Sequence, residues 1–239
     1  MGYQRFYVAQ PLSLGEHELP EQTAHYMARV LRLDVGARIQ VFDGSGDEFL
    51  AKLTQVGKKS VTVQLTEKIA GLAESPLKVH LGQGLSKGER MDWAIQKATE
   101  LGVTHITPLF TEHCEVRLNK ERAEKRLEHW RQVAISACEQ CGRSQIPIIH
   151  PIEKLATWAD QLNADLKLVL HPQAQPFAQY AAPQTLALLI GPEGGLSAGE
   201  VEQVLTQGFQ AVSLGPRVFR TETAPIAAVA VAQHLWGDF

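Results

Sequence analysis

The sequence predicts an α/β protein with a parallel sheet in its carboxy-terminal part and a smaller, mostly β domain in front of it. Beyond residue 76, short apolar segments alternate with helical patterns, which is typical of a parallel sheet. One of these segments, 185–190, is an unbroken apolar run that ends in a glycine-rich turn, as a buried strand does when it leads into a binding loop. Before residue 70, several segments alternate apolar and polar residues with the period of two that is typical of β-strands.

The composition excludes several classes of protein. The chain has 239 residues, 44% hydrophobic and 21% charged, and its formal net charge of −3 argues against coating nucleic acid by charge alone. No segment reaches the roughly 18 unbroken apolar residues of a membrane span, and the amino terminus lacks an apolar signal core, so we expect no membrane partner. The chain has three cysteines, Cys114, Cys138 and Cys141. This number is small and odd, which argues against a disulfide framework and indicates a cytoplasmic protein.

Cys138 and Cys141 have the spacing of a redox motif or of two metal ligands. They fall near the end of a long helical pattern, where two small residues three positions apart more often only pack against neighbours. We favour packing and expect no metal site.

The amino-terminal domain is expected to be built around a hairpin. Residues 37–56 have the pattern of two strands joined by a turn at 43–47, and alternation resumes at 60–65. Residues 5–8 are a further strand candidate, and 21–33 have the periodicity of a single helix.

Three arginines of this domain admit two interpretations. Arg29 and Arg32 share one face of the expected helix, and Arg5 lies in the first strand. They either form a phosphate-binding patch or are ordinary solubilising charges, because only clustering in space would make this charge-balanced domain basic.

A linker is expected at 70–76, where small residues, glycine and proline come together between two regular patterns. We therefore predict an amino-terminal domain of residues 1–72 and a carboxy-terminal domain of residues 73–239.

The carboxy-terminal domain is expected to alternate strands with helices. Strands are predicted at 77–81, 106–110, 166–170, 185–190 and 211–214, and helices at 89–101, at 120–140, from 198 onward and at 224–232. Gly102 is placed to end the first helix, Asn119 to cap the second and Ser197 to begin the third through a capping box with Glu200.

Two strand-end loops of this domain predict one shared pocket. Residues 191–195 contain three glycines, whose missing Cβ atoms leave backbone N–H and C=O groups free to contact a ligand. The pattern recurs at Gly215–Pro216 after the next short strand. A flat heterocycle held by backbone groups would fit such loops.

The last helical segment is apolar on nearly every side, so it is expected to lie in the core or at a subunit interface. Pro225 fits its first turn if Thr223 is the cap, because the missing N–H would have no partner there anyway.

Basic residues concentrate between Arg117 and Arg131, where six Lys or Arg stand against three Glu. Such a run is usually a solvated helix face with pairs such as Glu121 and Lys125, although binding of nucleic acid is the alternative.

Taken together, these motifs resemble those of the SPOUT superfamily of methyltransferases, and more narrowly of the 16S ribosomal RNA uracil-N3 methyltransferase family. The segments that carry the resemblance are 189–196, 214–215 and 220–224, with 5–8, His25, 30–32, 96–102, Glu139–Gln140 and Arg143. The resemblance covers nearly the whole chain, with small departures at Cys141 and at Val218–Phe219.

The resemblance implies an amino-terminal PUA-like RNA-binding barrel and a carboxy-terminal domain with a deep trefoil knot. It also implies a homodimer formed through the knot domain, with 16S rRNA of the small ribosomal subunit as the substrate and S-adenosylmethionine as the cofactor. The residues that it places against the cofactor are Leu170, Ile190, Gly191, Pro192, Glu193, Gly194, Gly195, Leu214, Gly215, Arg220, Thr221, Glu222, Thr223 and Ala224.

Transfer of a methyl group to uracil N3 requires removal of the N3 proton or stabilisation of the resulting anion. Glu222 is the candidate base and Arg220 the candidate anion or phosphate ligand, while the alternative for Glu222 is a carboxylate favoured by a helix dipole. The residues expected to contact RNA are Arg5, Tyr7, Arg29, Arg32, Lys87 and Arg143.

Two other functions fit the same motifs. One is a SPOUT methyltransferase that acts on another RNA or atom, such as a ribose 2′-oxygen of transfer RNA. The other is a non-catalytic RNA-binding assembly factor, in which the glycine loops are only structural.

Overall fold

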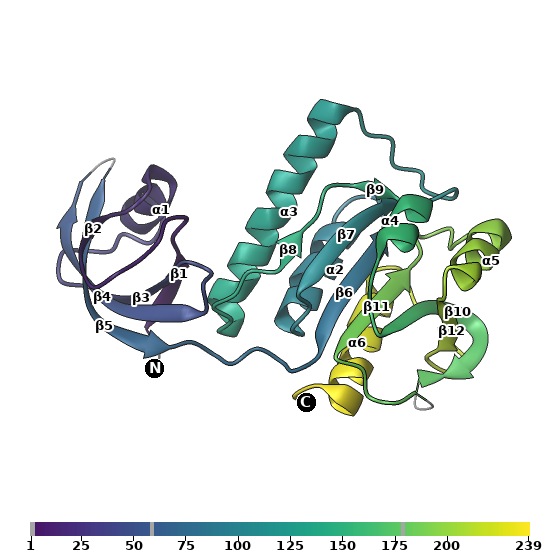
Figure 1. The fold of residues 1–239 in the computed structure, drawn as a ribbon. Helices are drawn as coiled ribbons and strands as arrows, with labels where there is room; N and C mark the ends of the chain where they lie inside the picture. The colour runs from purple at the N-terminus through teal and green to yellow at the C-terminus, as the bar shows by residue number, and fades with distance from the viewer. Residues whose placement is uncertain (1–2, 58–59, 178–179) are drawn as a thin grey trace. The chain divides into compact units, whose positions relative to one another are not determined.

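A computed structural model describes residues 3–57, 60–177 and 180–239 of the chain (Figure 1). The chain forms two compact units, one of residues 1–74 and 138–146 and the other of residues 75–137 and 147–239. The sequence predicted two continuous domains divided after residue 72. The structure divides the chain after Glu74 and adds the segment 138–146 to the first unit.

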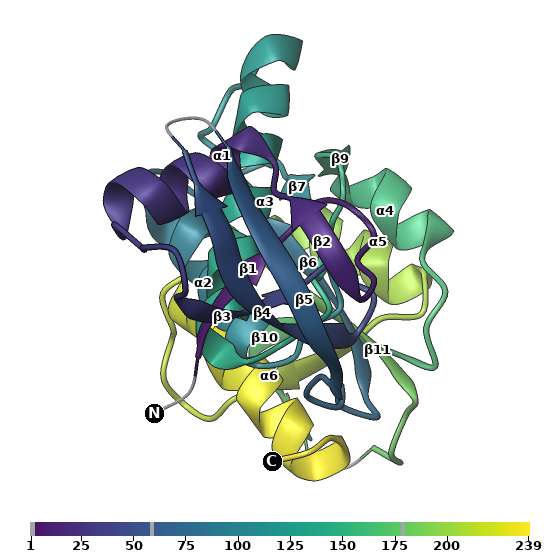
Figure 2. The same cartoon turned by 90° about the vertical axis from the view of Figure 1, so that its left-hand side faces the viewer.

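The first unit contains a five-stranded sheet in the order β1-β3-β4-β5-β2 (Figure 2). Its strands are β1 (Gln4–Tyr7), β2 (Gly15–Glu18), β3 (Arg38–Phe42), β4 (Asp47–Val56) and β5 (Val61–Ala70). The expected hairpin is confirmed as β3 and β4, which pair antiparallel, while β1 joins β3 in parallel. In the turn between them, the Asp43 carboxylate accepts a hydrogen bond of 3.0 Å from the Ser45 N–H.

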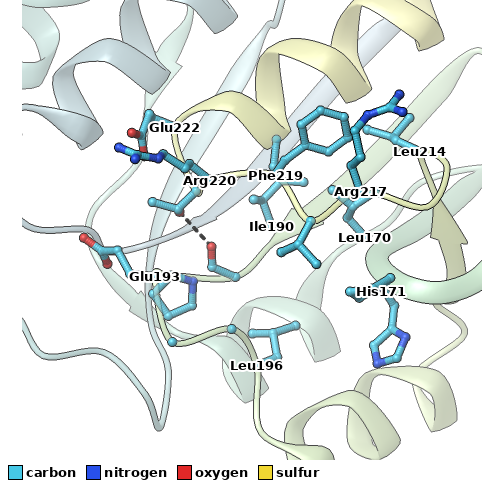
Figure 3. Close-up of a pocket in the computed structure, with 18 of the residues that line it drawn as sticks. Leu170, His171, Ile190, Glu193, Leu196, Leu214, Arg217, Phe219, Arg220 and Glu222 are labelled. Carbon is cyan, nitrogen blue, oxygen red and sulfur yellow. Dashed lines mark hydrogen bonds between the residues drawn. The ribbon is translucent and has the colours of Figure 1, made fainter.

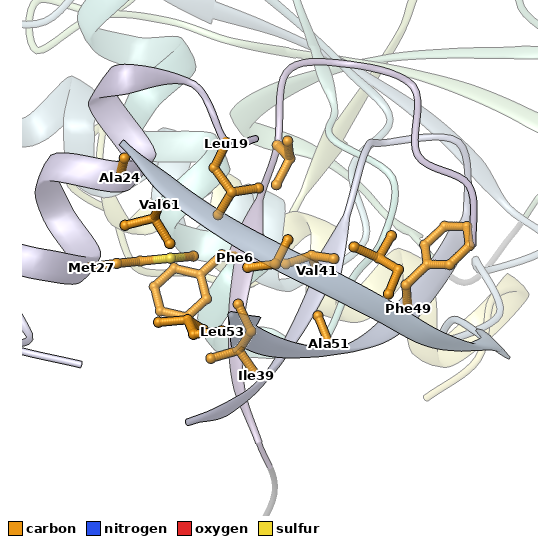
Figure 4. Packing of buried hydrophobic residues seen from close by; sticks show 13 residues of the cluster. Phe6, Leu19, Ala24, Met27, Ile39, Val41, Phe49, Ala51, Leu53 and Val61 are labelled. Carbon is orange, nitrogen blue, oxygen red and sulfur yellow. The ribbon is translucent and has the colours of Figure 1, made fainter. Parts of the chain in front are cut away.

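The core of this unit is formed by strand residues that alternate toward one side of the sheet (Figure 4). Phe6, Ile39 and Val41 come from the parallel pair, and all three are at most 1% exposed. Met27 packs into the same cluster from the helical segment and is fully buried.

That helical segment differs from the single helix expected at 21–33. α1 (Glu21–His25) passes into a π-helix, η1 (Tyr26–Val30), in which the Leu31 N–H bonds to the Tyr26 carbonyl five residues back. The wider turn changes which side chains face the core. Met27 is buried, but the apolar residues Tyr26 and Val30, which helical periodicity would place on the same apolar face, are 44% and 59% exposed.

Two buried ion pairs hold the segment 138–146 in the first unit. Arg143 pairs with Glu74 at 2.5 Å, and both side chains are less than a tenth exposed. Arg5 pairs with Glu48, whose carboxylate also accepts the Ser144 hydroxyl. Charges removed from water need such partners, which makes the segment inseparable from the sheet.

The second unit contains a parallel sheet in the order β12-β10-β11-β6-β7-β8, with β9 beside β7. Its strands are β6 (Lys78–Gly84), β7 (His105–Phe110), β8 (Ile148–Ile149), β9 (Glu153–Lys154), β10 (Leu166–Pro176), β11 (Thr185–Ile190) and β12 (Gln210–Ser213). The expected fold class is confirmed, because every strand pair in this sheet is parallel.

Helices cover both faces of this sheet. They are α2 (Arg90–Glu100), α3 (Lys120–Cys141), α4 (Leu155–Gln161), α5 (Ala198–Thr206) and α6 (Thr223–Trp236). Ala187 and Leu189 of β11 pack into one cluster with residues of α4 and α5. Leu186 and Leu188 alternate to the other face, where α6 packs on α2 and β6. None of the helices in the described part of the chain has the length and apolar character needed to cross a membrane.

Helix ends follow the sequence signals in three of four cases. Ser197 and Glu200 form the capping box, the Asn119 side chain accepts the Arg122 N–H at 2.9 Å, and Gly102 has a φ of +84° after α2. The expected cap at Thr223 is wrong. Glu222 is the capping residue and Thr223 the first residue of α6, because the Arg220 carbonyl already accepts the Thr223 N–H.

The chain doubles back after its last strand. β12 lies at the edge of the sheet next to β10, whereas α6 packs on α2 and β6 beyond β11. The segment 214–222 therefore crosses the carboxyl ends of β10 and β11 to reach α6. The trefoil knot, which the usual rule against threaded connections would exclude, stays a prediction.

Three histidine rings of the second unit lie against one another near the amino-terminal ends of β6 and β7. His80, His105 and His150 have ring centroids 5.2–5.3 Å apart, and the Trp158 indole donates to His80 at 3.3 Å. Burial first, and then the neighbouring rings, lower the pKa of His80 from 6.5 to about 3. Burial also lowers the pKa of His105 and His150. The described residues contain no cluster of three or more side chains suited to hold a metal.

These depressed pKa values predict acid sensitivity of the second unit. The folded state binds protons less readily than the unfolded chain, so stability is present above pH 6.5 and is lost as the pH falls toward 3. The free energy of unfolding is measured in urea by tryptophan fluorescence. Between pH 7.5 and 5, its decrease should be smaller for His80→Gln than for the natural chain by up to about 2 kcal/mol. All four tryptophans lie in this unit, and the exposed His25→Gln is the control; equal losses in both variants would contradict the prediction.

Candidate functional site

A cavity of about 730 Å³ lies where β10, β11 and β12 end (Figure 3). Three segments form its walls: 170–172 from β10, 190–196 from β11, and 214–222 after β12. The carboxyl ends of parallel strands are the usual place for a ligand site in such a sheet. The expected shared pocket is therefore present.

Most residues expected to contact a cofactor meet in this cavity. The lining includes Leu170, Ile190, Gly191, Pro192, Glu193, Gly194, Gly195, Leu214, Gly215, Arg220, Thr221, Glu222 and Ala224. Thr223 is not among the lining residues, because as the first residue of α6 it is exposed.

The structure adds lining residues that were not among the expected cofactor contacts: Arg90, His171, Pro172, Leu196, Val201, Arg217, Val218 and Phe219. Arg217 to Phe219 could have been found, since they lie in the same loop as Arg220. His171 and Pro172 could not, because the sequence pattern of β10 ends at Leu170. The pairing of β10 with β12 shifts register between Leu170 and Gln175, and this irregularity places 171–172 in the wall.

Close backbone packing shapes the floor of the cavity. A Cβ on Gly84 of β6 would lie 2.5 Å from the Pro192 backbone nitrogen, closer than real Cβ atoms approach. Gly195 has a φ of +70°, a conformation that side chains disfavour. Close packing at Gly84 and the positive φ of Gly195 therefore favour glycine at these two positions, and the loop 191–195 presents backbone at its three glycines.

A single buried hydroxyl joins the loops. Thr221 is 6% exposed, and its Oγ1 donates to the Gly191 carbonyl at 2.9 Å. The same oxygen accepts from Gln83 Nε2 at 3.1 Å and lies 3.2 Å from Ser86 Oγ. The third loop is thereby fixed to the first loop and to the end of β6.

A network of charges lines one side of the cavity. Arg90 of α2 pairs with Glu193 at 2.9 Å and with Glu222 at 3.6 Å, and the Lys87 N–H donates to Glu193 at 2.9 Å. Partial burial opposes ionisation of Glu193, but the Lys87 N–H and the Arg90 guanidinium together lower its pKa. The contact to Glu222 is an ion pair without a hydrogen bond, so Glu222 Oε2 is buried with no hydrogen-bond partner among the described residues.

Two further arginines face solvent at the cavity. Arg217 and Arg220 are exposed, and neither forms an ion pair with a described residue. In Figure 3, Arg220 and Glu222 lie toward one end of the cavity and Arg217 and His171 toward the other. The cavity thus combines a backbone floor with positive charge at its opening.

The residues expected to contact RNA fall into two groups. Lys87 is exposed beside the cavity and pairs with Glu115, while Arg29 and Arg32 are exposed in the first unit. Tyr7 is partly buried against Phe42, with ring centroids 5.8 Å apart. Contact of these four residues with RNA stays a prediction.

Arg5 and Arg143 do not keep that role. Both guanidinium groups are buried in the ion pairs with Glu48 and Glu74, and Arg5 also donates to the Cys138 carbonyl at 2.7 Å. An arginine committed to a buried carboxylate cannot leave it for phosphate without exposing an unpaired charge.

The three cysteines are free, and the environments of Cys114 and Cys138 favour packing over reactivity. Burial raises the pKa of Cys138 to about 12, and its thiol donates to the Gln145 carbonyl. Burial likewise raises the pKa of Cys114. Thiols held protonated are poor nucleophiles and poor metal ligands.

Comparison with known proteins agrees with both units. Residues 73–233 match the model of an RNA methyltransferase domain, and residues 19–66 match that of an RNA methyltransferase PUA domain. The structure is similar to that of a putative methyltransferase from Legionella pneumophila solved with its cofactor S-adenosylmethionine, with a TM-score of 0.98, 41% identity and full coverage of both chains. It is also similar to ribosomal RNA small subunit methyltransferase E from Neisseria gonorrhoeae bound to S-adenosylmethionine, with a TM-score of 0.93, 39% identity and full coverage.

A parallel sheet with a backbone-lined cavity at its carboxyl ends, preceded by a PUA domain, defines this chain as an RNA methyltransferase. Its sequence is 35% identical to ribosomal RNA small subunit methyltransferase E of Buchnera aphidicola over 98% of this chain and 94% of the relative. The corresponding protein of Bacillus subtilis is 31% identical over 89% and 88%. The chain belongs to the ribosomal RNA small subunit methyltransferase E family.

The role of Thr221 as the joint between loops can be tested by stability. Thr221→Val keeps the shape but removes the hydroxyl, leaving the Gly191 carbonyl and Gln83 amide without their partner, so the free energy of unfolding should fall by about 1–3 kcal/mol. Thr221→Ser keeps the hydroxyl and is the matched control. Urea unfolding followed by tryptophan fluorescence measures both, and equal stability of the two variants would show that the hydroxyl is dispensable.

Proposed function

We propose that the chain transfers the methyl group of S-adenosylmethionine to N3 of a uridine in 16S rRNA of the small ribosomal subunit. The observation that carries this proposal is the cavity of three backbone-rich loops in a chain of this family. Two fully covered structural relatives were solved with S-adenosylmethionine bound. A ribosomal substrate also implies that the chain works in the cytoplasm.

The residues of the cavity fit S-adenosylmethionine. The loop 191–195 offers backbone donors and acceptors to a flat adenine, since its glycines carry no side chains to block the approach. Ile190, Leu196 and Leu214 add apolar walls, and a volume of about 730 Å³ is in the range of cofactor sites.

When bound, the cofactor supplies an electrophilic methyl group, so the chain mainly has to orient the base and manage its proton. Glu222 receives the N3 proton in this proposal, because the residue lines the cavity and its buried Oε2 accepts no hydrogen bond from the described residues. Arg90 holds this carboxylate by its ion pair. Arg220, exposed at the cavity, is placed to bind the anion that develops on the uracil ring or an adjacent phosphate.

Uracil N3 lies on the base-pairing edge, so the substrate nucleotide has to be unpaired or flipped out. The exposed opening of the cavity, with Arg217 and Arg220 beside it, suits an extruded nucleotide with its phosphates. A SPOUT enzyme that acts on another atom, such as a ribose 2′-oxygen of transfer RNA, is the competing proposal, and a non-catalytic assembly factor is the second.

One experiment separates these three functions. Small ribosomal subunits from a strain that lacks this methyltransferase are incubated with the protein and radiolabelled S-adenosylmethionine, and the product nucleoside is identified by mass spectrometry. The proposal expects 3-methyluridine in 16S rRNA. A ribose-methylated product, or label only in transfer RNA, would select the competing enzyme, and binding without transfer would select the assembly factor.

Variants of Arg220 and Glu222 test the assigned chemistry. Arg220→Ala and Glu222→Gln should each lower methyl transfer by about 100-fold or more, which is the usual contribution of a general base or an anion ligand. The affinity for S-adenosylmethionine, measured by calorimetry, should change little. Lys78→Ala, exposed at the opposite end of β6, is the control. A parallel loss of cofactor affinity would assign Arg220 or Glu222 to cofactor binding instead.

We also propose that the chain forms a homodimer through its second unit. α6 leaves Ile226, Ala227, Ala230 and Val231 only partly buried, a narrow apolar stripe whose small residues allow close helix approach. Trp93 on the neighbouring α2 is 51% exposed. We expect sedimentation equilibrium to give a dimer, and Ala227→Glu with Ala230→Glu to give a monomer; a natural chain that sediments as a monomer would refute this.

A further inference from the structure

A second hollow, of about 640 Å³, lies on the second unit away from the cavity-lining loops. We call it the α3 groove, and it is lined by Val116, Arg117, Leu118, Arg122, Lys125, Arg126 and His129. Four of these seven residues are Lys or Arg and none is Asp or Glu. The groove is therefore strongly positive although the chain as a whole is slightly negative.

The helical repeat separates the charges of α3. Arg122, Arg126 and His129 recur at spacings of four and three, so they share one face of the helix. The intervening glutamates lie to the side of this face. Glu121 pairs with Lys125 and Glu128 with Arg131, which leaves Arg117, Arg122 and Arg126 without an ion pair among the described residues. An ordinary solvated face mixes both signs, whereas the acidic contact made to this face by a described residue, that of Asp92, goes to His129 and not to the arginines.

The groove is held rigidly by its neighbours. Asp92 of α2 accepts from His129 Nε2 at 2.7 Å and from Trp130 Nε1 at 3.0 Å, and Trp130 is 2% exposed. Asn119 caps the start of α3. Basic side chains on a fixed scaffold lose less entropy on binding a ligand than those on a free tail.

A short segment connects the groove to the cavity. His113 Nδ1 lies 3.0 Å from the Gly194 carbonyl, and the Glu112 N–H donates to Glu200 at 2.8 Å, so this segment packs on the first cavity loop and on α5. Arg117 follows His113 by four residues, and that length of chain spans at most about 14 Å. The groove therefore begins within a few nucleotides' reach of the cavity opening.

We propose that the α3 groove binds the ribose–phosphate backbone of the RNA next to the nucleotide that is methylated. Arg117, Arg122 and Arg126 contact phosphates, and the aliphatic side chains of Val116 and Leu118 pack against ribose. The proposal rests on the proposed function in one respect, namely that the substrate is RNA. An acidic protein surface would also complement the charge, but the short segment that joins the groove to the first cavity loop of an RNA methyltransferase domain favours RNA.

The test compares two double variants with the same change in net charge. Arg122→Gln with Arg126→Gln removes two charges of the groove. Lys78→Gln with Arg131→Gln removes two exposed charges outside it, one at the opposite end of β6 and one paired with Glu128. Glutamine is nearly as good a helix former as arginine, so α3 should persist in both variants.

Binding of fluorescein-labelled polyuridylate is measured by anisotropy over a range of salt concentrations. Each lost phosphate contact removes about 0.7 from the slope of log affinity against log salt. The groove variant should therefore lose about 1.4 from the slope and bind roughly 25-fold more weakly at 0.1 M salt, while the control changes by less than about threefold. For methylation of small subunits, the groove variant should show a raised KM and an unchanged kcat.

Cofactor affinity and tryptophan fluorescence serve as checks that the variants are folded. Equal RNA binding by the two double variants would overturn the proposal. So would a greater loss of binding to labelled poly-L-glutamate than to polyuridylate, which would make the groove a protein-docking site. If the natural chain binds RNA through the groove but methylates no 16S rRNA, the proposed function fails and the groove proposal stands.

Discussion

The site depends on three loops from separate strands being held together at one end of a parallel sheet. Glycine positions of the first loop offer no side chain for apolar packing, so hydrogen bonds contribute to fixing this loop. Thr221 does this with one hydroxyl that reaches Gly191 and Gln83 from a buried position. The Gly191 carbonyl accepts this hydrogen bond from a buried hydroxyl, so loss of the hydroxyl should destabilise the arrangement of the loops. The crossing of segment 214–222 over the strand ends brings Thr221 to this place.

This arrangement of the loops explains why backbone and charged side chains occupy different parts of the cavity. Backbone forms the floor, since a Cβ at Gly84 would collide with Pro192 and displace the first loop. Charged side chains are left to one side and to the opening, where Arg90 links Glu193 to Glu222. The floor suits recognition of a fixed cofactor, whereas the charged groups suit a nucleic acid that arrives from solvent. The α3 groove extends this second property along the surface of the same unit.

In the first unit, two of the arginines form ion pairs inside the unit instead of facing solvent. Arg5 and Arg143 lie in segments that resemble those of RNA-modifying enzymes, yet both are buried beside carboxylates and join residues 138–146 to the sheet. Arg29 and Arg32 remain exposed. Burial, which the residue type does not reveal, decides whether an arginine is a structural ion-pair partner or available to phosphate.

The sequence alone determined the features that arise from local interactions. The hairpin around 43–47, the capping box at Ser197, the helix end at Gly102 and the glycine loop at 191–195 each depend on residues a few positions apart, and each was predicted. Tertiary structure decided the rest. His171 and Pro172 reach the cavity where the pairing of β10 with β12 shifts register. Arg90 reaches it from a helix more than a hundred residues away from Glu193, and the π-turn at Tyr26–Val30 changes which side chains of a helical segment face the core. These outcomes depend on contacts between distant segments, which local patterns cannot encode because each segment is compatible with many partners.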